Sequence, residues 1–191
     1  IDDWSGFGQR TTGSGTVKFQ QVFVAAEDVI PFDQAFLQPT LVGPFAQIMH
    51  AAIETGIARA AFEETLVRVR QARPWIDSGV EAATQDPLTL LELGRIVADV
   101  RASEVLLKQA ARSIDAAKPQ PTEDNITQAS LDVAKVRAHS SETALKASSK
   151  LIELAGSRGS QRADGLDRFW RNARVHTLHD AARWKYYFIA N

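Results

Sequence analysis

The chain has 191 residues, of which 45% are hydrophobic, and its formal net charge is −1, which is an ordinary composition for a globular protein. The near-zero charge argues against a nucleic-acid partner, and no apolar run is long enough for a membrane span. The absence of cysteine excludes disulfides, thiolate metal ligands and cysteine nucleophiles, and it fits a cytoplasmic protein.

The first thirty residues carry the signals of strands and turns. Glycines punctuate the segment up to Gly15, and short strands are expected at residues 17–19 and 22–24. Because two or three strands cannot fold alone, this segment must pack on something else. We therefore assign residues 1–38 to the C-terminal part of a β-domain with its linker, and residues 39–191 to a helical bundle domain.

The first long helix is expected over residues 45–70 and is ended by Pro74. Its helical periodicity predicts one inward face that combines large apolar residues with a stripe of small ones. The small residues would let another helix backbone approach closely. The predicted inward face consists of Phe45, Met49, Ala52, Ile53, Gly56, Ile57 and Ala60.

Two further long helices have clear local boundary signals. Asp86 as N-cap and Pro87 in the first turn begin one that runs to about residue 117. Thr122 begins the other, and Gly156 is placed to end it in the left-handed conformation. The third helix is rich in alanine and serine, which favours tight packing on several neighbours, including another subunit. Long helices joined by short proline-marked turns indicate an antiparallel bundle.

The last thirty residues hold the densest group of chemically active side chains. A short helix over residues 165–175 is followed by a turn with His176 and His179, and Asp180 can cap a last, aromatic helix. Histidine titrates near neutral pH, so proton chemistry is expected here. The alternative is that both histidines are solvent-exposed side chains of a turn between two helices and have no catalytic role. A metal site is a weaker hypothesis, because no third cluster of ligands appears in the sequence.

Four stretches, in order, resemble the acyl-CoA-dehydrogenase-like flavin monooxygenases, the group of dibenzothiophene monooxygenase and the sulfur-acquisition oxidoreductases. Arg-Asn-Ala-Arg-x-His-Thr-x-His-Asp at residues 171–180 is the most specific of them. Residues 3–15, with Trp-Ser-Gly-Phe-Gly, resemble the flavin-facing β-domain segment of that family. Residues 72–75, Ala-Arg-Pro-Trp, and residues 153–159, Glu-Leu-Ala-Gly-Ser-Arg-Gly, resemble the end of its first bundle helix and its glycine loop.

The resemblance implies a mainly α fold: an antiparallel bundle of the acyl-CoA dehydrogenase C-terminal type, preceded by a short β-domain remnant. A full member would have a further N-terminal part, so we expect this chain to be a C-terminal fragment that is inactive alone. By resemblance, His176 and His179 border the flavin ring and substrate cavity and are the catalytic candidates. By resemblance also, Trp4 and Ser14 face the flavin.

Two arginines are the candidates for a flavin phosphate. Arg158 lies in a glycine loop, where backbone N–H groups and a guanidinium can meet one anion, and Arg73 lies at a helix end. Glu153 stands where FAD-binding dehydrogenases usually have glutamine, and their Arg-x-x-Phe-Gly motif is missing, which favours FMN over FAD. The remaining candidates for binding the cofactor are the loop residues Gly156, Ser157 and Gly159.

The resemblance implies a flavin-dependent monooxygenase that receives reduced FMN from a separate flavin reductase. Oxygen would add to the flavin to give a C4a-hydroperoxide, which oxygenates a small, organosulfur substrate. The family also implies a homotetramer. Two alternatives stay open: an FAD-dependent acyl-CoA dehydrogenase, in which Asp180 lies near the usual place of the catalytic glutamate, and a non-catalytic helical scaffold of the same fold.

Overall fold

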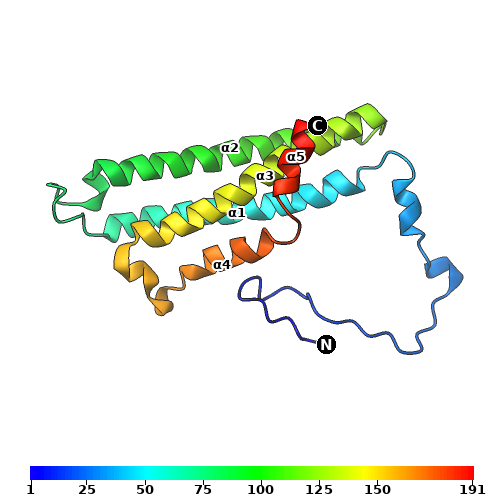
Figure 1. Ribbon diagram of the computed structural model, residues 1–191, viewed down its shortest axis with the longest axis horizontal. Helices are drawn as coiled ribbons and strands as arrows, with labels where there is room; N and C mark the ends of the chain where they lie inside the picture. Colours follow the sequence, from blue (N-terminus) through cyan, green and yellow to red (C-terminus); the bar gives the residue numbers. More distant parts are fainter.

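The computed structural model describes residues 1–191 and consists of helices joined by turns, without a strand. α1 (Val42–Gln71), α2 (Pro87–Ala117) and α3 (Glu123–Leu154) lie lengthwise beside one another, and α3 packs against all four other α-helices (Figure 1). α4 (Asp167–His176) and α5 (Arg183–Ala190) complete the bundle. Short 3-10 turns occupy Ala26–Asp28, Phe32–Phe36, Ala83–Gln85, Gly156–Ser160 and Arg162–Asp164. None of these helices is long and apolar enough to cross a membrane.

The boundaries of α2 and α3 form as their local sequences predict. The Asp86 carboxylate accepts hydrogen bonds from the backbone N–H groups of Leu88 and Thr89, which no preceding turn can satisfy. Thr122 and Asn125 cap α3 reciprocally, each side chain accepting from the other's backbone N–H. Gly156 takes φ +69° directly after α3, the left-handed conformation that glycine adopts without strain.

Most of the predicted inward face of α1 is wrong, although Ile57 packs against a core cluster. Phe45, Met49 and Ile53 are 57%, 50% and 47% exposed, and the small residues Ala52 and Gly56 are exposed as well. The face turned to the bundle is instead mostly small and polar, and around Glu54 it meets hydroxyls and a guanidinium of α3. The buried residues of α1 are Pro44, Ala51, Glu54, Thr55, Ala58, Ala61, Thr65 and Val69.

The alanine- and serine-rich face of α3 lies at the centre of the bundle, as its composition predicts. Ala144, Ala147 and Leu151 belong to one core cluster, and Ala129, Val133 and Val136 belong to a second cluster further toward the start of the helix. Ser148 is fully buried and donates its hydroxyl to the carbonyl of Ala144. Small side chains allow several helices to approach α3 at native packing density.

The strands predicted at residues 17–19 and 22–24 do not form. The segment up to residue 25 is irregular and extends away from the bundle before it returns as α1 (Figure 1). A strand needs a neighbouring strand for its backbone hydrogen bonds, and nothing in this chain supplies one. Phe19 and Phe23 are accordingly 79% and 89% exposed.

The start of the chain is nevertheless fixed to α4 at one point. The Gln9 N–H donates to Asn172 Oδ1 at 2.8 Å, the Arg171 guanidinium donates to the Phe7 carbonyl at 2.9 Å, and Phe7 stacks on Trp170. Gly8 is buried between them, and a Cβ at this position would overlap the carbonyl of Arg171. These contacts hold the first residues beside the middle of α4.

We expect Gly8→Ala to release the first residues from α4, because the added methyl group meets backbone that cannot move aside. Trypsin should then cleave after the exposed Arg10 several times faster than in the unchanged protein. Gly13→Ala is the matched control, because no atom lies within 4 Å of a Cβ there. Equal cleavage rates in both variants would show that the close approach at Gly8 does not hold the segment.

Candidate functional site

The site is organised around Glu54, a fully buried carboxylate on α1. It accepts hydrogen bonds from the Arg137 guanidinium, from the Ser141 hydroxyl at 2.8 Å and from the Ser140 hydroxyl at 3.1 Å, all three on α3. A fourth comes from Nδ1 of His176, the last residue of α4, at 3.1 Å. One carboxylate thus joins three helices at the place where the sequence predicts proton chemistry.

The Glu54 carboxylate is held in its ionised form. Burial raises its pKa, but the hydrogen bond from His176 and the charge of Arg137 outweigh burial, so the pKa lies below its ordinary value. An ionised carboxylate can only accept hydrogen bonds. The Nδ1 atom of His176 must therefore carry the shared proton.

A third histidine, which the sequence reasoning missed, completes this group. His50 lies one helical turn before Glu54 on α1, and its Nδ1 is 3.2 Å from Nε2 of His176. Its ring also meets the ring of His179 edge to face, with 3.9 Å between centroids. The i, i+4 spacing of His50 and Glu54 was the available signal, because two titratable residues then share one face in the mostly apolar first half of the helix.

The three histidines line a cavity of about 610 Å³ together with the start of the chain. Trp4 and Ser14 both line it, because the contacts at Gly8 hold this segment in place. The Trp4 indole N–H donates to the Gln9 carbonyl, and the Ser14 hydroxyl is 2.8 Å from that of Thr12. No carboxylate lines this cavity; its residues are Trp4, Gly6, Phe7, Gln9, Thr12, Ser14, His50, Val175, His176, Leu178 and His179.

Asp180 does not cap the last helix. α5 begins at Arg183, with Ala182 in the capping position and no side-chain cap. The Asp180 carboxylate is instead 2.9 Å from the Lys185 ammonium and 3.6 Å from Nη2 of Arg137. Burial raises the Asp180 pKa, but the hydrogen bond and charge of Lys185 outweigh it, so the pKa lies below its ordinary value. The two cations therefore hold Asp180 ionised and outside the histidine cavity.

The two arginines predicted to bind a phosphate and the three loop residues predicted to bind the cofactor line a second cavity, of about 660 Å³. Arg68 also lines it but is already paired with Glu64 and Asp164, whereas no ion pair within the chain takes up Arg73 or Arg158. The two arginines are exposed and available for an anion. The predicted residues that meet here are Arg73, Gly156, Ser157, Arg158 and Gly159.

The two cavities share no residue and lie near opposite ends of α1. His50 borders the first and Gln71 the second, and 21 residues of α-helix span about 30 Å. The five-carbon ribityl chain of a flavin, with bonds of about 1.5 Å, covers well under half of that distance. One FMN molecule therefore cannot reach both cavities of the same chain.

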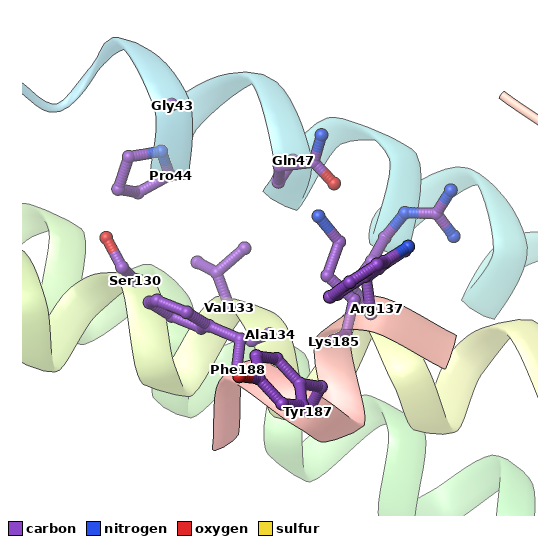
Figure 2. Close-up of a pocket in the computed structure, with 11 residues that line it drawn as sticks. Gly43, Pro44, Gln47, Ser130, Val133, Ala134, Arg137, Lys185, Tyr187 and Phe188 are labelled. Atoms are coloured by element: carbon purple, nitrogen blue, oxygen red, sulfur yellow. The ribbon is translucent and has the colours of Figure 1, made fainter. Parts of the chain in front are cut away.

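A third cavity, of about 480 Å³, lies between α1, α3 and α5 (Figure 2). Tyr187 and Phe188 of α5 face Val133 and Ala134 of α3 across it. The fully buried Arg137 is part of its wall, so this guanidinium separates the third cavity from Glu54 and the histidines. Nowhere in the chain do three or more histidine, aspartate or glutamate side chains form a group able to hold a metal ion.

Comparison with known proteins places this geometry in a family. The model of the C-terminal domain of acyl-CoA dehydrogenases matches residues 48–184, well over half of the chain. The chain belongs to the acyl-CoA dehydrogenase C-terminal domain family. Its helical bundle is the bundle of that family.

Its similar relatives in this family are flavin-dependent monooxygenases. A dibenzothiophene monooxygenase of Mycolicibacterium goodii is 34% identical over 100% of this chain and 48% of its own length. The probable FMNH2-dependent monooxygenase SfnC of Pseudomonas putida is 30% identical over 96% of this chain and 48% of its own length. TdsC of Paenibacillus sp. A11-2, solved with FMN and indole, matches with a TM-score of 0.94 and 32% identity over 100% of this chain and 51% of its own. The chain thus spans about half the length of these relatives.

The environment of His50 predicts a specific dependence of stability on pH. Its pKa is lowered to about 4 by burial and by the neighbouring His179, His176 and Arg137, against a smaller opposing effect of Asp180. Between pH 6.5 and 4 the unfolded chain binds a proton at this position that the folded chain does not, so the free energy of unfolding falls as pH falls.

We expect His50→Gln to remove this part of the pH dependence. Urea unfolding from pH 8 to pH 4 should show a smaller loss of the free energy of unfolding in the variant than in the unchanged protein, and most of the difference should arise below pH 6.5. The values at pH 8 control for any general destabilisation. Two parallel pH curves would contradict the assignment.

Proposed function

We propose that this chain is part of an FMN-dependent monooxygenase, with the flavin ring in the histidine cavity and its substrate beside it. When bound, reduced FMN activates O2 so that one oxygen atom is transferred to a small organosulfur substrate, and a separate flavin reductase supplies the reduced cofactor. The observation that carries the proposal is a cavity that combines an indole, a hydroxyl and three imidazoles without any carboxylate.

This composition favours oxygen transfer over acyl-CoA dehydrogenation. A dehydrogenase of this fold needs a free carboxylate to abstract the α-proton of its thioester substrate. Asp180, the nearest in sequence to that position, is paired with Lys185 and Arg137, and Glu54 is saturated with hydrogen bonds. Neither carboxylate lines the histidine cavity.

Each side chain of the cavity has a role that its chemistry can support. The Trp4 ring offers a stacking face for the flavin, and the Ser14 hydroxyl can bond a ring carbonyl or nitrogen. His176 and His179 supply donors and acceptors at the place where oxygen reacts. The surrounding protein excludes water and keeps these groups in fixed positions.

We infer that the phosphate of each FMN is bound by a second copy of this chain. Arg73, Arg158 and the loop of Gly156–Ser160 form a cavity that one FMN cannot reach from the histidines of the same chain. Assembly of copies, as a homotetramer, would bring a phosphate cavity beside each ring cavity. The exposed apolar face of α1, with Phe45, supports such association.

The phosphate cavity favours FMN over FAD. Glu153 lines this cavity. Its only ion-pair partner is Lys150, which also pairs with Glu92, so Lys150 does not fully neutralise the negative charge of Glu153. Asp86 is a second carboxylate of the same wall. These two carboxylates repel the diphosphate of FAD more strongly than the single phosphate of FMN. The two unpaired arginines of the cavity are then sufficient to bind the single phosphate.

The proposal is tested by turnover of the purified intact protein of which this chain is a part. Oxygen-dependent product formation with reduced FMN and an aromatic or alkyl sulfur compound is the expected result. Reduction of an electron acceptor in the presence of an acyl-CoA, without oxygen consumption, would instead identify a dehydrogenase. Absence of bound flavin absorbance at saturating FMN would identify a scaffold that has lost the cofactor.

We expect His179→Ala to reduce coupled turnover by about 10²-fold or more, the effect of losing one positioned acid–base or hydrogen-bonding group. The melting temperature and flavin binding should change little, since His179 is exposed in a turn and makes no side-chain hydrogen bond within the chain. Release of hydrogen peroxide should rise, as oxygen is consumed without transfer. Full coupled turnover, or an unfolded variant, would show that this histidine is structural or incidental.

We expect Arg158→Ala to weaken FMN binding at least tenfold and riboflavin binding little, since a charge-assisted hydrogen bond contributes about 1.5–3 kcal/mol. Equal losses for both flavins would exclude contact with the phosphate.

A mixed oligomer of Arg158→Ala and His179→Ala chains should regain turnover at limiting FMN, because one chain then contributes an intact ring cavity and the other an intact phosphate cavity. Mixed oligomers as inactive as either parent would contradict a site shared between chains.

A further inference from the structure

A continuous hydrogen-bonded chain links the buried carboxylate of Glu54 to the wall of the histidine cavity. Glu54 Oε1 is 3.1 Å from Nδ1 of His176, and Nε2 of the same ring is 3.2 Å from Nδ1 of His50. Both imidazoles line the cavity, whereas Glu54 does not. Every heavy-atom step is therefore short enough for a proton to pass.

The ionised carboxylate determines which ring nitrogen holds each proton. Because Glu54 can only accept, His176 carries its proton on Nδ1 and, when neutral, presents a lone pair at Nε2. His50 must then donate from its own Nδ1, which leaves its Nε2 as a lone pair. No side chain of the protein donates to or accepts from that last nitrogen, so it is free for a molecule in the cavity.

We propose that Glu54, His176 and His50 form a proton relay whose outer end is Nε2 of His50. This proposal rests on the flavin site proposed above, since the relay would exchange protons with the substrate or oxygen bound there. Within it, His50 is the catalytic residue at the cavity, and Glu54 is a positioning residue that acts through His176.

Each transfer through the relay balances. When a group in the cavity gives a proton to His50 Nε2, the Nδ1–H bond of His50 breaks and an Nε2–H bond of His176 forms. The positive charge then lies on His176, hydrogen-bonded to the negative carboxylate of Glu54. The reverse sequence returns a proton to the cavity and restores both neutral rings. No oxidant or further reactant is needed.

The surroundings of Glu54 prepare it to stabilise that charge on His176. Arg137 fixes one side of the carboxylate, and the hydroxyls of Ser140 and Ser141 fix the other, so its orientation toward His176 is determined by α3. The low pKa of His50 keeps the proton from remaining on the outer ring, because burial and the adjacent His179, His176 and Arg137 disfavour a charge there, against a smaller effect of Asp180.

The arrangement of protons is tested directly by solid-state ¹⁵N NMR of histidine-labelled protein at pH 7.5. We expect both His176 and His50 to be protonated at Nδ1 and unprotonated at Nε2, with signals assigned by the variants His176→Asn and His50→Asn. A proton on Nε2 of either ring would overturn the relay. This readout does not depend on flavin, so it separates failure of the relay from failure of the proposed function.

The role of Glu54 is tested in a double variant, because Glu54→Gln alone removes the nearest counter-charge of the buried Arg137 and can unfold the protein. Glu54→Met with Arg137→Met replaces the buried pair by apolar side chains, an exchange that proteins often tolerate. We expect it to retain flavin, to lose the single Nδ1–H form of His176 and to lower kcat by about 10²-fold. Thr65→Val is the matched control, because Thr65 is an equally buried polar residue of α1 outside the relay.

His50→Phe provides an independent test that spares the buried pair. It should lower kcat to a similar extent while His176 keeps its Nδ1 proton. Combining it with the double Met variant should cause little additional loss, because groups that act as one unit are not additive. Unchanged kcat in His50→Phe, or losses that multiply in the combined variant, would overturn the proposal.

Discussion

The pairing of Glu54 with Arg137 is the interaction on which the rest of this structure depends. Both side chains are fully buried, and removal of water from two charges is costly unless they are paired and hydrogen-bonded. The carboxylate satisfies this condition only when α1, α3 and α4 are all in place, because Ser140, Ser141 and His176 complete its hydrogen bonds. The need to hydrogen-bond one buried carboxylate therefore fixes the positions of three helices relative to one another. It also orients the imidazole of His176 at the cavity.

This polar contact explains why the two faces of the first half of α1 are reversed relative to an ordinary amphipathic helix. The bundle side carries Glu54, Thr55 and alanines, while Met49 and Ile53 remain half exposed. Exposed apolar side chains of this size form a surface that another protein surface can cover. The packing of Glu54 against Arg137 thus has two results. Small and polar residues of α1 are buried in the bundle, and large apolar residues are exposed outside it.

Local chemistry is what the sequence predicts well. Asp86, Thr122 and Gly156 mark helix ends through bonds to residues a few positions away, and the structure confirms all three. The site is harder to predict because its contacts join residues far apart: 126 positions separate His50 from His176. Periodicity chose the apolar face of α1 as the inner one, since no local rule reveals a buried guanidinium on α3. The resemblance did group Trp4 with the terminal histidines, but it did not include His50 or Glu54.

The attachment of the first residues to α4 has a consequence for the order in which the site can be built during synthesis. Gln9 and Asn172 are 163 positions apart, so the ribosome, at about 5–20 residues per second, needs roughly 10–30 s to produce the second after the first. Throughout that interval the extended segment, with its exposed phenylalanines, has no α4 to hold it. The Trp4 wall of the cavity therefore cannot form before α4 has been made. A nascent chain of this protein passes through a stage in which the three long helices have been synthesised and the cavity does not yet exist.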